Sequence, residues 1–320
     1  DLRVMSPAES PGYPIPLPNA TREAALRVLK SVRGITGGGG RPPRGNVEKR
    51  PARVVGSPEV VPMCDTRTTN RRLWNEWSDA FQALWNADTA DDGLPPAPCP
   101  FTTDAPGGEH PDLLPTIAGV DFVELGCGGG QASVGTAAEG AGRVVGVDFS
   151  AAQLEHARRL RSLYGVDVQF VGGDVTNLPL AADAFDVAFS GWVVQMIEDL
   201  DAYLSEARRV LRDDGILVFD VPHPFYELFD PSTATLERSY HGPDRRTITI
   251  DESYEADLVV FDRTVSDLHT ALVEAGFDVR RVLEPGSDDP EAYDDDPLDS
   301  NRPELMATVP RNLRFWAVVR

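Results

Sequence analysis

The sequence predicts an α/β fold with a doubly wound, mostly parallel sheet. From residue 113 onward, short apolar runs rich in β-branched residues alternate with longer segments that have helical spacing. Uniformly apolar strands are typical of a parallel sheet buried on both faces, and regular alternation of strand and helix produces such a sheet. The expected strands in this region are 120–125, 143–148, 166–171, 185–190 and 215–221.

The helices between these strands have recognisable ends. Ser150, followed three residues later by Gln153, predicts a capping box at the start of a helix that runs to residue 164. Asp199 predicts the start of the next helix, and a further helix is expected to start at Thr264 and stop at Gly276. In a sheet wound in this way, ligands bind at the carboxyl ends of the strands, beside the point where the strand order reverses.

Composition divides the chain into three parts. Residues 1–60 are rich in Pro, Gly and Arg and carry ten Lys and Arg against five Asp and Glu, so we expect a disordered extension there. Such an extension could serve as a polyproline II ligand or as a basic arm for nucleic acid, and the alternative is sequence upstream of a misassigned start codon. Residues 61–112 hold one aromatic-faced helix and a Pro-rich linker, and residues 113–320 form the α/β domain, with insertions at 222–263 and 285–310.

The chain is strongly acidic, with a net charge of −21. Beyond residue 60 arginine is the only strong cation, because the two lysines, Lys30 and Lys49, lie in the extension. A large acidic excess keeps a protein surface solvated in concentrated salt, so the composition predicts a halophilic source. Molar salt screens long-range charge, and charge alone therefore does not exclude nucleic-acid partners.

Cysteine content and hydropathy narrow the class of protein further. The three cysteines, Cys64, Cys99 and Cys127, are an odd number without metal-ligand spacing, so we expect neither a disulfide framework nor a metal site. The acidic run 294–296 also lacks the spacing of a calcium loop. No apolar run reaches the length of a membrane span and no secretory signal pattern stands at the N-terminus, so we expect a cytoplasmic protein without a membrane partner.

The strand 120–125 ends in a glutamate and opens into a glycine-rich turn, FVELGCGGGQAS. Gly126, Gly128 and Gly130 permit a tight turn and a close approach of the backbone to a ligand. A dinucleotide fingerprint would need a third glycine where Gln131 stands. The carboxylate of Glu124 is a poor neighbour for a pyrophosphate, but it suits a ligand that carries positive charge and hydroxyl groups. S-adenosylmethionine, with a sulfonium, an ammonium and a ribose but no phosphate, meets that description.

Five segments, in the same order, resemble the motifs of class I S-adenosylmethionine-dependent methyltransferases. They are VELGCGGG, VVGVDFS, GGDVTNLPL, FDVAFSGWVVQMI and LRDDGILVF. The resemblance covers roughly residues 70–320 and is in particular to the small-molecule branch that includes enzymes of ubiquinone and menaquinone biosynthesis. It implies a Rossmann-like sheet of seven strands, with 277–285 and 313–319 as the sixth and seventh and the last strand antiparallel. It also implies S-adenosylmethionine as the cofactor.

The resemblance further implies which residues bind the cofactor. Asp148 is expected to bind the ribose hydroxyls, and its separation of 22 residues from Gly126 is the length that one helix and one strand require. Asp174 is expected to accept a hydrogen bond from the adenine amine, with Val175 supplying a backbone contact. The full set expected in the matched segments is Glu124, Gly126, Cys127, Gly128, Gly130, Asp148, Phe149, Asp174, Val175 and Ser190.

The helix upstream of the sheet, with Thr69 or Asn70 as its N-cap, has aromatic residues at helical spacing. Such a stripe usually packs into a core. Members of the resembled family often fold an N-terminal helix over the cofactor. That arrangement would place Trp77 or Phe81 against the sulfonium or the adenine.

Methyl transfer from a sulfonium is a direct displacement on an activated carbon, so the protein mainly positions donor and acceptor. The acceptor-side candidates follow the fourth and fifth strands and are Trp192, Gln195, Phe225 and Tyr226. His223 is the candidate for a base or for orienting an acceptor hydroxyl, because histidine takes up a proton near neutral pH. The alternative is that His223, between two prolines, only shapes the loop.

The acceptor is expected to be a small molecule. Enzymes of this fold that methylate base amines of nucleic acids carry Asp, Asn or Ser, then two prolines and an aromatic residue, after the fourth strand. This chain has Ser190-Gly191-Trp192-Val193 there. Neither the acceptor atom nor the oligomeric state follows from the sequence. The alternatives to a methyltransferase are an NAD-dependent oxidoreductase, weakened by the missing third glycine, and a catalytically silent module that binds S-adenosylmethionine.

Overall fold

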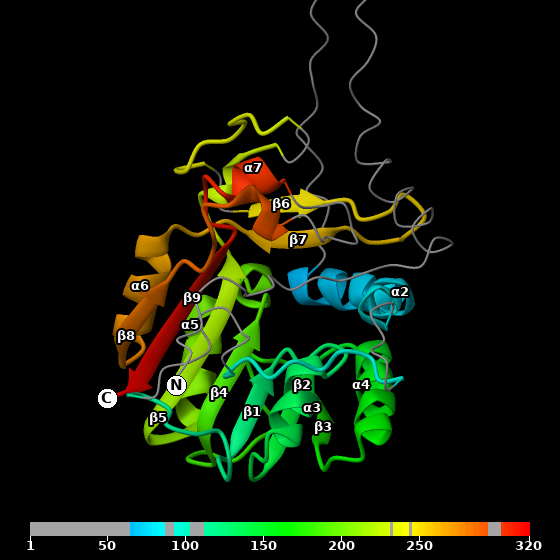
Figure 1. Ribbon diagram of the computed structural model, residues 1–320, viewed down its shortest axis with the longest axis vertical. Helices are drawn as coiled ribbons and strands as arrows, with labels where there is room; N and C mark the ends of the chain where they lie inside the picture. The colour runs from blue at the N-terminus through cyan, green and yellow to red at the C-terminus, as the bar shows by residue number, and fades with distance from the viewer. Residues whose placement is uncertain (1–64, 87–92, 103–111, 231–232, 243–244, 294–301) are drawn as a thin grey trace, which may run out of the picture.

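The computed structural model describes residues 65–86, 93–102, 112–230, 233–242, 245–293 and 302–320. The extension predicted at 1–60, Cys64 and the acidic run 294–296 lie outside these residues. In the described part, a seven-stranded sheet has helices on both faces, and a separate helix and a β-hairpin lie beyond one end of its strands (Figure 1).

The strand order confirms the predicted fold class. It is β3-β2-β1-β4-β5-β9-β8, in which β1 to β5 run parallel and β9 is antiparallel to both of its neighbours. The order reverses between β1 and β4, which places the expected ligand crevice at their carboxyl ends. The strands are β1 (Phe122–Leu125), β2 (Val144–Asp148), β3 (Gln169–Gly172), β4 (Phe185–Gly191), β5 (Leu211–Pro222), β8 (Phe277–Leu283) and β9 (Asn312–Val319).

The helices beside the sheet start at the predicted caps. Ser150 caps α4 by accepting from the Gln153 N–H, Asp199 caps α5, and Thr264 starts α6 with a full capping box. A full capping box at α4 would also have the Gln153 side chain accept from the Ser150 N–H, and this bond is not formed. The Ser150 N–H donates to Asp148 instead, and the Gln153 side chain accepts from Gln82. None of the described helices combines the length and apolar composition needed to cross a membrane. The helices and single turns are α3 (Gln131–Ala138), α4 (Ala151–Tyr164), α5 (Leu200–Val210), α6 (Val265–Glu274), α7 (Pro303–Met306), η1 (Val194–Met196), η2 (Tyr226–Leu228) and η3 (Pro290–Tyr293).

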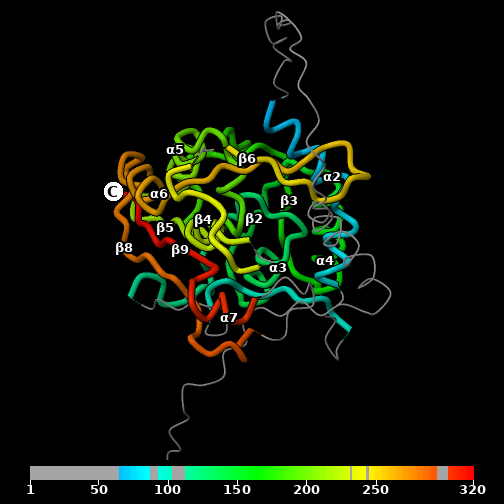
Figure 2. The backbone as a smooth tube through the Cα atoms, turned by 90° about the horizontal axis from the view of Figure 1, so that it is seen from above, coloured from blue at the N-terminus to red at the C-terminus, as the bar shows by residue number. Residues whose placement is uncertain are grey.

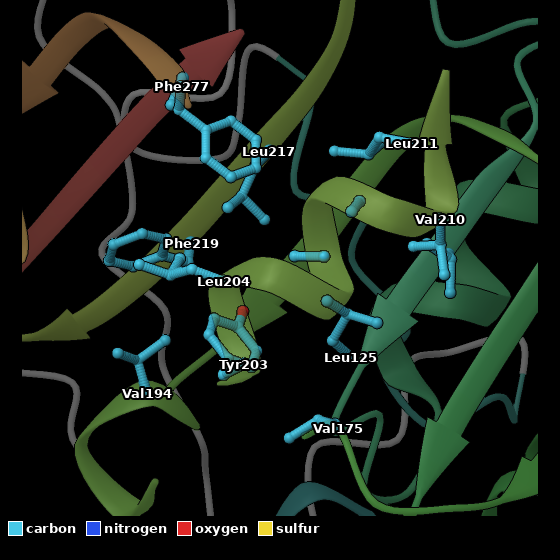
Figure 3. Close-up of a cluster of buried hydrophobic side chains, with 14 of the residues drawn as sticks. Leu125, Val175, Val194, Tyr203, Leu204, Val210, Leu211, Leu217, Phe219 and Phe277 are labelled. Carbon is cyan, nitrogen blue, oxygen red and sulfur yellow. The ribbon is translucent and has the colours of Figure 1, made fainter. Parts of the chain in front are cut away.

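Successive side chains along each strand point to opposite faces of the sheet, and both faces pack into a hydrophobic core. On one face Leu125, Tyr203 and Phe219 belong to a cluster that includes α5 and α6 (Figure 3). On the other face Phe122 and Trp316 pack in a cluster with α4. Because both faces are covered, the central strands β1, β2 and β4 are mostly apolar, as the sequence predicts.

Two elements lie across the carboxyl ends of the strands. α2 (Thr66–Asn86) runs beside α4, and β6 (Arg245–Ile248) pairs with β7 (Leu258–Phe261) in a hairpin within the first insertion (Figures 1 and 2). α2 starts before the expected caps, because Asp65 accepts from the backbone N–H at position 67. Its buried face mixes apolar and polar residues, and the polar ones are Thr66, Asn70, Ser78 and Gln82.

Candidate cofactor and acceptor site

The glycine-rich turn between β1 and α3 has the tight geometry that the sequence predicts. Gly126, Gly128 and Gly130 have φ values of 79°, 49° and 80°, a region that favours glycine. A Cβ on Gly126 would lie 2.6 Å from the Val193 side chain. Among the described residues, a Cβ on Gly128 would meet only Gln153, at 3.9 Å. The turn is therefore closely packed at its start and open to a ligand at its middle glycine.

Glu124 is buried below this turn and braces the helix that follows. Its Oε2 accepts hydrogen bonds from the Ser133 N–H, at 2.8 Å, and from the Ser133 hydroxyl. Burial raises the pKa of Glu124 to about 8, although the bonds from Ser133 act in the opposite direction. The carboxyl is thus mostly protonated at neutral pH, and its expected contact with a cationic ligand stays a prediction.

Asp148, at the end of β2, joins the glycine turn to the start of α4. One carboxylate oxygen accepts from the Gly128 N–H and the other from the Ser150 N–H, both at 2.8 Å. Burial raises the pKa of Asp148 to about 6, and the backbone bonds partly offset that effect. The side chain lies beside the turn, where its spacing from Gly126 places it, and the half-buried Phe149 follows.

Asp174, which the resemblance assigns to adenine, binds two side chains of the protein. One oxygen accepts from the backbone and hydroxyl of Thr176 at 2.8 Å, and the other accepts from the Arg67 guanidinium at 2.9 Å. Burial acts to raise the pKa of Asp174, but the bonds from Thr176 and Arg67 outweigh it and the pKa is lowered. Val175 beside it is buried. Sequence reasoning missed Arg67, for which the only signal was its proximity to the helix expected over the cofactor.

The side of α2 above the glycine turn is polar. Gln82 lies against Gly129, where an added Cβ would collide with the Gln82 amide. That amide accepts from Gln131 Nε2 at 2.6 Å and donates to Gln153 Oε1 at 2.7 Å. Gln131, which replaces the third glycine of a dinucleotide fingerprint, therefore helps to hold α2 on the turn.

The aromatic residues of α2 pack against one another. The Trp77 ring centroid lies 5.1 Å from that of Trp74 and 5.0 Å from that of Phe81. Trp74 Nε1 lies 3.3 Å from Met196 Sδ, in the turn after β4. Sequence reasoning missed Trp74, and the role of Trp77 and Phe81 against the cofactor stays a prediction.

Two of the expected cofactor residues have their side chains turned into the protein. Ser190 is fully buried, and its hydroxyl donates to the Leu125 carbonyl at 2.8 Å, which ties β4 to the end of β1. The Cys127 thiol is packed near Gly146, and burial raises its pKa well above the usual value. These residues have only their backbone groups to offer a ligand.

The acceptor-side candidates after β4 belong to a firmly held turn. Trp192 has a φ of 58°, which is rare for a bulky residue, and it is 41% exposed. Its N–H donates to the Asp220 carbonyl, and its own carbonyl accepts from Gln195 Nε2 at 2.7 Å. The Arg311 guanidinium lies 5.7 Å from the centroid of its ring. Backbone strain at this edge of the sheet is typical of a functional position.

His223, at the end of β5, is buried and held at both ring nitrogens. Its Nδ1 lies 3.1 Å from the Phe225 N–H, and its Nε2 lies 2.8 Å from Glu284 Oε1. Since a backbone N–H can only donate, Nδ1 accepts and Nε2 donates its proton to Glu284. This geometry favours the loop-shaping role over that of a free base. Of the acceptor-side candidates after β5, Phe225 is 42% exposed and Tyr226 is the first residue of η2. Sequence reasoning missed Glu284, because nothing near it in the sequence indicates His223 as its partner.

Comparison with known proteins agrees with this arrangement. Residues 123–219 match the family described as a methyltransferase domain. A solved S-adenosylmethionine-dependent methyltransferase from Mesorhizobium loti is 27% identical, with a TM-score of 0.52 over 65% of this chain and 94% of the other. Residues 123–219 therefore carry a methyltransferase domain, and the fold around them is similar to that of an S-adenosylmethionine-dependent methyltransferase.

Two curated relatives are similar to parts of this chain. An uncharacterized transposon protein of Streptomyces fradiae is 40% identical over 115 residues, which are 35% of this chain and 32% of that protein. A malonyl-(acyl-carrier protein) O-methyltransferase of Methylovorus is 29% identical over 175 residues, 53% of each chain. The chain therefore spans about a third to a half of the length of these relatives.

The residues of the methyltransferase domain fit S-adenosylmethionine. The backbone at Gly128 is open to a ligand, and the buried Asp148 carboxylate lies beside it at the switch of strand order. Asp174 adds a second acceptor after β3. In the part of the chain that the structure describes, no group of His, Cys, Asp and Glu is placed to hold a metal ion.

Gly126→Ala is expected to destabilise the methyltransferase domain by about 2–4 kcal/mol, because a Cβ there combines a positive φ with the overlap on Val193. Gly140→Ala is the matched control, since its φ is 86° but its Cβ would meet Ala118 at a comfortable 3.9 Å. The free energy of unfolding of that variant is expected to fall by only about 1–2 kcal/mol. Urea unfolding measures both, and equal losses would contradict the overlap.

Proposed function

We propose that the protein transfers a methyl group from S-adenosylmethionine to a small-molecule acceptor by direct displacement. The observation that carries the proposal is the open glycine turn joined to Asp148, next to the strained turn after β4. S-adenosylmethionine supplies a methyl group on a positively charged sulfur. The protein supplies position: the turn holds the methionine part, Asp148 the ribose and Asp174 the adenine.

Features of the acceptor side support a small molecule. α2, the β6–β7 hairpin and α7 lie around the carboxyl ends of the strands (Figure 2). Trp192 offers a partly exposed ring, and Gln195 Oε1 is buried with no hydrogen-bond partner among the described residues. Since buried polar atoms are normally paired, Gln195 is suited to accept from a hydroxyl or amine of the acceptor. Residues 190–193 lack the two prolines of base-amine methyltransferases.

Two acceptor classes follow for testing. The motif resemblance favours a ring compound of the kind methylated in ubiquinone and menaquinone biosynthesis, which the Trp192 ring suits. The Methylovorus relative is named for a malonyl group on a carrier protein, so carrier-bound acyl groups are the second class. In either case His223 shapes the loop that carries Phe225, and displacement needs no base from it.

We further propose that the protein works in a salt-rich cytoplasm. The net charge of −21 and the absence of lysine beyond residue 49 support this.

Calorimetric titration of the full chain in molar KCl, with S-adenosylmethionine and separately with NADH, tests the cofactor. We expect micromolar binding of S-adenosylmethionine and none of NADH. Transfer of a radiolabelled methyl group to quinols, phenols and malonyl carrier protein, with transfer RNA as the comparison, tests the acceptor. Preference for NADH would establish an oxidoreductase instead. Cofactor binding without transfer across the panel would favour a silent binding module.

A further inference from the structure

α2 contacts both halves of the site. At one end of the helix Gln82 lies on the glycine turn, and at the other end Arg67 binds Asp174. Asn70, one turn after Arg67, contacts the β6–β7 hairpin instead. α2 is therefore the element that the cofactor side and the acceptor side share.

Asn70 pairs with β7 as a neighbouring strand would. Its Oδ1 accepts from the Val259 N–H at 2.8 Å, and its Nδ2 donates to the Val259 carbonyl at 2.9 Å. The same Nδ2 lies 3.4 Å from the Met196 carbonyl in η1. Asn70 is only 1% exposed, so water cannot readily take its place on these backbone groups. One buried amide thus joins α2, the hairpin and the turn after β4.

The hairpin and the turn after β4 are also fastened to each other. Arg263, just after β7, donates to the carbonyls of Val194, at 3.1 Å, and of Ile197. Trp192 and Gln195 belong to this turn. A shift of the hairpin relative to the sheet therefore shifts the residues proposed to meet the acceptor.

We infer that Asn70 is a positioning residue that couples cofactor binding to the acceptor side. The inference rests on the proposed function, because it takes S-adenosylmethionine to bind at the glycine turn below α2. A ligand that orders the glycine turn and Asp174 also orders α2, because Gln82 joins the helix to the turn and Arg67 joins it to Asp174. Asn70 then fixes the position of the β6–β7 hairpin, and the hairpin fixes the position of the turn that carries Trp192. Binding of the cofactor therefore favours binding of the acceptor, and binding of the acceptor favours that of the cofactor by the same factor.

Hydrogen exchange of the full chain, with and without S-adenosylhomocysteine, tests this coupling. In the wild type the ligand is expected to slow amide exchange at the turn 126–130 and in the hairpin 245–261 by about fivefold or more. In Asn70→Ala the turn is expected to stay protected and the hairpin to lose its response. Asp79→Ala is the matched control, because Asp79 lies on the α4 side of the same helix and pairs with His156.

Asn70→Asp is a second variant, which keeps the size and shape of the side chain. The carboxylate retains the bond from the Val259 N–H but faces the two carbonyl oxygens without a donor, so it is also expected to uncouple the hairpin. Hairpin protection equal to wild type in either folded variant would overturn the coupling, and so would a wild-type hairpin that ignores the ligand while the turn responds. No protection anywhere in the wild type would instead overturn the proposed cofactor site.

Discussion

Asp148→Ala is expected to weaken binding of S-adenosylmethionine by tenfold or more, which corresponds to about 1.4 kcal/mol. The carboxylate holds the N–H groups of Gly128 and Ser150, so its removal leaves two backbone donors without partners and loosens the turn. The proposed bond to the ribose is lost at the same time. Calorimetric titration of the two proteins under identical conditions measures the ratio of their dissociation constants.

Asp121→Ala is the matched control for this prediction. Asp121 precedes β1, at the opposite end of the strand from the glycine turn, where it pairs with Arg212 and accepts from the Arg143 N–H. Its loss is expected to lower stability but to leave the dissociation constant for S-adenosylmethionine within about twofold. If Asp148→Ala binds the cofactor as tightly as wild type, the ribose must be held by another residue.

Glu124→Gln is expected to remove a large pH dependence from the stability of the protein. Burial raises the pKa of Glu124 to about 8, from a usual value of 4.5 in the unfolded chain. The folded state therefore keeps a proton that the unfolded state loses, and this favours unfolding as pH rises. Stability from this group is fully present below pH 4.5 and is lost as pH rises toward 8. Between about pH 5 and about pH 7 the free energy of unfolding falls by about 2 kcal/mol.

Urea unfolding of the wild type and Glu124→Gln across this range measures the difference. Glutamine retains an oxygen for the Ser133 N–H and cannot ionise, so the variant is expected to be the more stable protein at neutral pH and to lose that advantage in acid. Asp148, with a pKa of about 6, adds a smaller fall in the same direction to both proteins. Glu139→Gln, at an exposed carboxyl after α3, should leave the profile unchanged. Parallel profiles for wild type and Glu124→Gln would show that Glu124 is not protonated in the fold.

The glycine turn and its contact with Asp148 were predictable because they depend on local features of the chain. The glycines act within one turn, where a positive φ depends on the residue itself, and their geometry is confirmed. Asp148 follows Gly126 by one helix and one strand, so the parallel winding alone brings the two together. The caps Ser150 and Thr264 are confirmed for the same reason, since a cap bonds to a residue three positions away.

Long-range side-chain partners could not be predicted in this way. Arg67 meets Asp174 across 107 residues, and Asn70 meets Val259 across 189. No periodicity or spacing indicates such pairs, because they form only after separate elements have docked at one edge of the sheet. His223 shows the consequence: its local context between two prolines allowed either a base or a loop-shaping residue, and the contact with Glu284 favours the second.

The sequence alone was enough to predict the central strands, the caps of α4, α5 and α6, and the glycine turn, since each depends on steric and hydrogen-bonding preferences of neighbouring residues. That α2 faces the site with amides as well as aromatic rings follows only from how the helix docks against the rest of the fold. An amide such as Gln82 or Asn70 can bond equally well to water in the unfolded chain, so its partner is chosen by the surfaces that the fold brings against it.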